Sequence, residues 1–115
     1  MGMNRQDWIA YCLTYPDAYE DYPFDEVIDE HAWTLMRHLK NKRSFASIFQ
    51  RDGSLVLNLK CDPTNGDHLR QLFDGIKPAY HMNKQHWISV YPGQDVPDDF
   101  IEKLIDDSWK LTKEK

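Results

Sequence analysis

The amino-acid sequence predicts one α+β domain over residues 1–115, an antiparallel β-sheet with helices packed on one face. Three observations predict this class. Capping signals mark helix starts at Asn4 and Asp62, apolar and polar residues alternate from Trp33 onward, and turn residues separate the alternating segments. The expected order of elements is α-β-β-β-α-β-β-α.

The first helix is expected over Arg5 to Thr14. Asn4 can accept from the free N–H groups of the first turn, and Asp7 completes a variant of the capping box. The buried stripe of this helix is Trp8, Ile9, Cys12 and Leu13. Residues 17–31 follow as an irregular acidic connection, with a short extended piece around residues 22–24.

A meander of three strands is expected next, over residues 33–40, 45–50 and 55–60. The turns between them are Lys40 to Arg43 and Arg51 to Gly53.

The second of these turns allows two registers. A three-residue loop with Gly53 left-handed pairs Phe45 and Phe49 with Leu59 and Leu55 on one buried face. We favour this register, because a two-residue loop puts both phenylalanines on the face opposite the leucines.

The second helix is expected to open at Asp62-Pro63, where aspartate caps and proline occupies the first turn, and to stop at Gly75. Its core contacts are Leu69, Leu72 and Phe73. A hairpin over residues 80–91 comes next, with its tip at Asn83-Lys84-Gln85. The last helix begins at Pro97, and its stripe is Phe100, Ile101, Leu104, Ile105, Ser108 and Leu111.

Composition places the protein among well-packed globular domains. Hydrophobic residues make up 41% of the chain and aromatic residues 13%, which excludes a disordered chain. No apolar run reaches the length of a membrane span, so we expect a cytoplasmic protein that does not use a membrane. A reducing compartment keeps Cys12 and Cys61 as free thiols, whereas a secreted protein would have one possible bridge.

Charge is segregated along the chain, although the net charge is −5. Residues 17–30 hold seven acids and no Lys or Arg, and residues 37–51 hold five basic residues and no acid. Two surfaces of opposite sign could serve different partners, or the segregation reflects solvated loops only.

The sequence has no recognisable catalytic or phosphate-binding motif. Cys61 stands at a helix start, where a thiol can become reactive, but a small buried residue is the more ordinary role there. His81 and His86 could meet across the hairpin as metal ligands with His68, although their spacing matches no strong zinc pattern. We therefore expect no enzyme activity and no cofactor. An enzyme built on Cys61, His81 and His86 is the weakest alternative.

Both candidate hairpin tips contain an Asn-Lys pair. The tips are Asn41-Lys42-Arg43 and Asn83-Lys84-Gln85. Lys42, Arg43 and Lys84 could neutralise phosphates, while Asn41, Asn83 and Gln85 could reach base edges. Asn-Lys is also a common turn pair, so two solvated turns are an equal alternative.

Four segments of the chain resemble the MmcQ/YjbR family: residues 19–24, 57–63, 78–87 and 107–111. The motif Tyr80-His81-Met82-Asn83-Lys84-x-His86-Trp87 is the most specific of them. The resemblance implies a CyaY-like (frataxin-like) fold, in which two β-hairpins form a double wing, and a DNA-binding function. It transfers no catalytic residues.

The leading expectation is thus a small non-enzymatic protein that binds double-stranded DNA through the two basic tips. A monomer is favoured, and no protein partner is identified. The alternative is a frataxin-like acidic module that binds a metal ion or a basic protein through Asp25, Glu26, Asp29 and Glu30.

Overall fold

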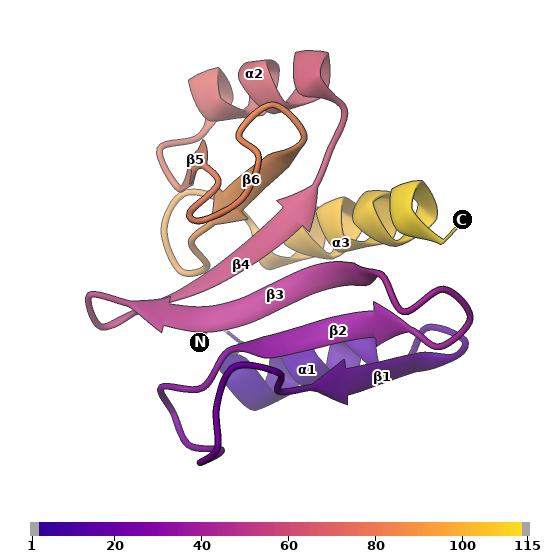
Figure 1. Ribbon diagram of the computed structural model, residues 1–115. Helices are drawn as coiled ribbons and strands as arrows, with labels where there is room; N and C mark the ends of the chain where they lie inside the picture. The colour runs from indigo at the N-terminus through magenta and orange to yellow at the C-terminus, as the bar shows by residue number, and fades with distance from the viewer. Residues whose placement is uncertain (1–2, 114–115) are drawn as a thin grey trace.

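The computed structural model describes residues 3–113, and within them an antiparallel six-stranded sheet forms the framework (Figure 1). The strands lie in the order β1-β2-β3-β4-β6-β5 and are β1 (Ala18–Asp21), β2 (Thr34–His38), β3 (Ser44–Arg51), β4 (Ser54–Lys60), β5 (Ile76–Pro78) and β6 (Trp87–Val90). The helices are α1 (Arg5–Cys12), α2 (Pro63–Leu72) and α3 (Asp98–Thr112). The predicted α+β class is confirmed.

The observed order of elements contains one strand more than predicted, because β1 occupies part of the segment expected to be irregular. β1 pairs with β2 through Tyr19↔Arg37 and Asp21↔Leu35. Its sequence, Ala-Tyr-Glu-Asp, has no alternating apolar pattern, since it is an outermost strand that buries little. An ion pair between Arg37 Nε and Asp21 Oδ2, at 2.7 Å, adds to the pairing.

The predicted helix starts are confirmed. Asn4 Oδ1 accepts from Asp7 N and Asp7 Oδ2 accepts from Asn4 N, both at 2.9 Å, which is the expected capping box. Asp62 caps α2 by accepting from Asn65 N at 3.3 Å, with Pro63 in the first turn.

The predicted helix ends were less accurate. α1 stops at Cys12 instead of Thr14, and α2 stops at Leu72. Three leucines assigned to buried stripes are exposed: Leu13 (42%), Leu72 (58%) and Leu111 (47%). Each lies in or just after the last turn of its helix. At the end of α3 the buried residue is instead Thr112, whose hydroxyl lies 2.8 Å from His38 Nε2.

The predicted register between β3 and β4 is wrong by one residue. The strands pair through Phe49↔Val56 and Arg51↔Ser54, which leaves a two-residue turn of Asp52 and Gly53. Both turn residues have positive φ (53° and 80°), as a type I′ hairpin turn requires.

The register prediction failed because both faces of the central strands are buried. Ile48 and Phe49 are adjacent on β3 and neither is exposed. Phe49 turns away from the helices and stacks on Trp33, with ring centroids 3.8 Å apart. A shift in the β2–β3 pairing next to Met36 brings Phe45 back to the helix side. An alternating pattern cannot choose a register when both faces are apolar.

The first arm of the second hairpin also differs from the prediction. The strand that pairs with β6 is β5, through Ile76↔Val90 and Pro78↔Ile88, so residues 79–86 form a loop. Tyr80, which was expected to begin the strand, instead packs over the sheet face that has no helices.

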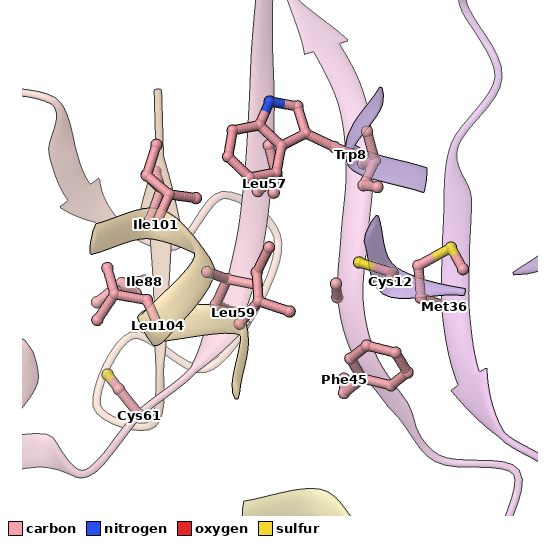
Figure 2. Close-up of a cluster of buried hydrophobic side chains, with 14 of the residues drawn as sticks. Trp8, Cys12, Met36, Phe45, Leu57, Leu59, Cys61, Ile88, Ile101 and Leu104 are labelled. Carbon is pink, nitrogen blue, oxygen red and sulfur yellow. The ribbon is translucent and has the colours of Figure 1, made fainter. Parts of the chain in front are cut away.

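The main core lies between the sheet and the helices (Figure 2). Trp8 and Cys12 reach it from α1, Ile101 and Leu104 from α3, and Leu57 from β4. No helix within residues 3–113 combines the length and apolar character that a bilayer crossing needs.

Candidate nucleic-acid interface

The turn between β2 and β3 contains the first predicted tip. Lys42 has a φ of 64°, and its N–H donates to His38 O at 2.8 Å. Asn41 Oδ1 accepts from Arg43 N, and Asn41 Nδ2 donates to Thr112 O, both at 2.9 Å. The Asn41 amide therefore builds this turn and ties it to the end of α3, whereas the side chains of Lys42 and Arg43 are exposed.

The second tip is closed in a similar way. Asn83 Oδ1 accepts from Gln85 N at 2.9 Å and from His86 N at 3.2 Å, and Asn83 O accepts from Trp87 N at 3.0 Å. The carbonyl side of the Asn83 amide is thus engaged in a local Asx-type turn. Lys84 and Gln85 remain exposed.

The strand pairing places both turns at the same end of the sheet. β2 ends and β3 begins at this end, and the pairs Ala46↔Leu59 and Leu59↔Ile88 continue the same row across β4 to β6. Lys60, the last residue of β4, pairs with Trp87, the first residue of β6. β4 lies between the two turns in the sheet (Figure 1).

The last turns of α3 bring further cations to this end. Ser108 Oγ accepts from Lys60 N at 2.9 Å and donates to Phe45 O at 2.6 Å, which fixes the helix beside the ends of β4 and β3. We call the resulting surface the basic end; its residues are Lys40, Lys42, Arg43, Lys60, Lys84, Lys110 and Lys113. Cations near the carboxyl end of a helix also complement its dipole.

Acidic groups adjoin the basic end. Lys110 Nζ pairs with Asp106 Oδ2 at 2.9 Å, and this contact lowers the pKa of Asp106. Asp17 lies beside Lys40 and Lys113 around a small hollow, and Asp62 lies beside Lys60 and Lys110 around another. The exposed cations that are least balanced are therefore those of the two turns.

Residues 22–33, which contain four of the acids, leave the opposite end of the sheet. β1 ends with Asp21 opposite Leu35, and β2 begins with Thr34 opposite Ile48, so residues 22–33 extend from the end that is away from the basic turns.

Arg5 holds the end of the acidic segment. Its guanidinium donates to the carbonyl oxygens of Glu30, Ala32 and Ile48 and to Thr34 Oγ1. Burial lowers the pKa of Arg5, and nearby acidic groups oppose this effect.

The site predicted from sequence lacked four residues of the basic end, Lys40, Lys60, Lys110 and Lys113. The cations at the end of the last helix were visible in the sequence. Their position beside the β2–β3 turn follows from contacts such as Asn41 to Thr112, which join residues 71 positions apart and have no local signal.

The residues considered for metal binding or nucleophilic chemistry do not form such a site within residues 3–113, where no three His, Cys, Asp or Glu side chains gather as metal ligands would. Cys61 is buried, and α2 passes so close that a Cβ on Gly66 would lie 2.9 Å from Cys61 Sγ. Burial raises the pKa of Cys61, which is the opposite of thiolate activation.

His38, which lies next to the basic end, is expected to make the folding stability of the protein depend on pH. The side chain is buried between Phe45 and Trp109, and Lys113 lies nearby. Burial, followed by the charge of Lys113, lowers the pKa of His38 below its ordinary value. The unfolded state therefore binds the His38 proton more readily than the folded state. The free energy of unfolding keeps its full value above the unfolded pKa of about 6.5, and it falls as the pH is lowered through that pKa.

We expect His38→Gln to flatten the stability profile between about pH 7 and pH 5. Urea unfolding across this range measures the effect, and His31→Gln, at an exposed histidine, is the control. An equal loss of stability on acidification in wild type and His38→Gln would contradict the assignment.

The fold and the basic end define a small α+β protein whose antiparallel sheet is covered by helices on one face and has two lysine-bearing turns at one end. The model of the YjbR family matches residues 13–111. Over 96% of this chain and 99% of its own length, YyaQ of Bacillus subtilis is 35% identical, and YjbR of Escherichia coli is 27% identical over 94% of this chain and 86% of its own length.

Solved structures show the same fold. A Pseudomonas syringae protein superposes with a TM-score of 0.82 at 34% identity, over 96% of this chain and 99% of its own. A Deinococcus radiodurans protein with a DUF419 domain gives 0.79 at 34% identity, over 96% of this chain and 78% of its own. The chain belongs to the YjbR family, which confirms the resemblance seen in the sequence.

Proposed function

We propose that this protein is a non-enzymatic DNA-binding protein that contacts the phosphate backbone with its basic end. The observation that carries the proposal is the common position of the two lysine-bearing turns, at the end of the sheet away from residues 22–33. Carboxylates close to a duplex repel it, and this arrangement keeps those of residues 25–30 at a distance.

The roles of the tip residues differ from those expected from sequence. Lys42, Arg43 and Lys84 contact phosphates in this proposal. The Asn41 amide and the carbonyl oxygen of the Asn83 amide hold their own turns, so in this proposal both residues serve mainly to present the lysines. The exposed Gln85 side chain and Asn83 Nδ2 are the groups that could reach a base edge. Binding of this kind depends mainly on charge and little on sequence.

Titration of a fluorescently labelled duplex at low and moderate salt tests the proposal. We expect binding that weakens with salt, and we expect Lys42→Ala with Lys84→Ala to reduce affinity about tenfold and to lower the salt slope by about 2. The charge-matched control is Lys77→Ala with Lys103→Ala, on β5 and in the middle of α3, which should bind like wild type. No salt-sensitive binding, or equal losses in the two double variants, would rule out the basic end as the interface.

A further inference from the structure

The sheet face without helices contains a groove of about 780 Å³, separate from the residues of the basic end. Two other hollows have volumes of about 250 and 220 Å³. Small-molecule sites in proteins usually occupy about 300–1,000 Å³ and combine aromatic walls with a few polar groups. This groove has that character, with Trp33 and Tyr80 in its walls and Ser47, Arg51, Asp25 and His81 around them.

One wall is fixed by buried polar groups. Asn58 and Ser89 are at most 1% exposed, on neighbouring strands. Ser89 Oγ accepts from Tyr80 N, and Asn58 Nδ2 donates to Tyr80 O, both at 2.9 Å. His81 follows with a φ of 62°, in the left-handed region that residues other than glycine seldom adopt. The network holds the Tyr80 and His81 rings, 4.0 Å apart, over the sheet.

The adjoining part of the groove, where the Trp33 ring centroid lies 6.4 Å from that of Tyr80, is equally constrained. The Trp33 ring stacks on the buried ring of Phe49, with 4° between their planes, and the backbone N–H of Trp33 donates to Asp25 Oδ2 at 3.0 Å. Arg5 holds the adjacent backbone through Ala32 O and Thr34 Oγ1. Both walls are therefore preorganised before any ligand enters, which reduces the entropic cost of binding.

The polar groups of the groove include both hydrogen-bond donors and hydrogen-bond acceptors. Arg51, whose Cζ lies 4.1 Å from the centroid of the Tyr80 ring, presents donors at one end. Asp25 presents carboxylate oxygens, and the Ser47 hydroxyl lies in the floor as part of a residue only 2% exposed. Asp25 and Asp52 together disfavour an anionic ligand such as a free phosphate.

We propose that this groove binds a nucleobase, that is, a neutral planar heteroaromatic ring that carries both donors and acceptors. Trp33, Tyr80 and the Arg51 guanidinium offer surfaces on which such a ring stacks, as bases do on aromatic and arginine planes. Asp25 accepts from its N–H groups, and Arg51 and Ser47 donate to its acceptors. The proposal does not rest on duplex binding by the basic end.

The base could belong to a free nucleoside or to an unpaired position in a strand. Amide NMR spectra of the full chain, titrated separately with guanosine, adenosine, uridine and a short single-stranded oligonucleotide, distinguish these sources. We expect saturable shifts at Trp33, Ser47, Tyr80 and His81. Saturation by a nucleoside at millimolar concentration or below indicates the free source, and saturation at the same residues by the oligonucleotide alone indicates the strand.

Two variants localise the site. Ser47→Leu fills the floor of the groove at a buried position. Arg51→Ala removes the guanidinium donors, and because Arg51 is exposed this variant keeps the test valid even where Ser47→Leu fails to fold. Each should weaken binding at least about tenfold. Thr64→Leu and Lys77→Ala, at exposed positions on α2 and β5, are the matched controls. Shifts that do not saturate with any probe, that map to the basic end, or that persist in Arg51→Ala would overturn the proposal, whatever the outcome of the duplex titration.

Discussion

Replacing Phe45 with alanine is expected to lower the free energy of unfolding by about 3–5 kcal/mol. The Phe45 ring is fully buried where β3 meets both α1 and α3. It contacts the ring of Tyr15 at 5.9 Å and that of His38 at 5.1 Å between centroids. Truncation leaves a cavity between β3, α1 and α3. The loss of stability is therefore the cost of that cavity plus the cost of the lost apolar burial.

Urea unfolding monitored by circular dichroism measures this loss as a lower midpoint at an unchanged slope. Phe24→Ala is the matched control, because the same side chain is 69% exposed there and its removal should change the free energy of unfolding by about 0.5 kcal/mol or less. If the two substitutions proved equally mild, the position of Phe45 in the core would be wrong.

The second large effect is expected at Asn58. Replacing it with alanine removes the donor to Tyr80 O and the acceptor for Ser89 Oγ, and it leaves the buried Ser89 hydroxyl and the partly buried Tyr80 carbonyl without those partners. A buried polar group left unsatisfied costs about 1–3 kcal/mol. We expect a total loss of about 2–4 kcal/mol, because a small cavity forms as well.

Ser47→Ala is the control for Asn58→Ala, since Ser47 pairs with Asn58 across β3 and β4 and is similarly buried. Amide hydrogen exchange adds a local readout. Asn58→Ala should accelerate exchange at Tyr80 and the residues around it, whereas Ser47→Ala should not. Unchanged protection of Tyr80 in Asn58→Ala would show that the network does not hold this loop.

The features predicted correctly from sequence are those with local causes. The Asn4–Asp7 capping box and the Asp62-Pro63 start depend on side chains that contact backbone within the same turn. The alternation from Trp33 predicted β2, from which Met36 reaches the main core. The motif at residues 80–87 predicted the family, and the match of the YjbR family model to residues 13–111 confirms this prediction.

The errors arose where distant partners decide the structure. β1 has no apolar pattern and forms only because β2 offers it hydrogen bonds. The β3–β4 register depends on Trp33, which covers Phe49 from a different part of the chain. The basic end was predicted as two turns, and it is completed by α3, whose contacts with those turns have no signal in the nearby sequence.

The two outermost strands determine how this sheet meets other chains. β1 spans four residues and carries Glu20 and Asp21, and β5 spans three residues and ends in Pro78, which has no N–H to donate. Long, flat edge strands can pair with strands of other chains, whereas short edge strands that contain charged residues or proline resist such pairing. Growth of the sheet into fibres or edge-to-edge aggregates is therefore discouraged at both margins.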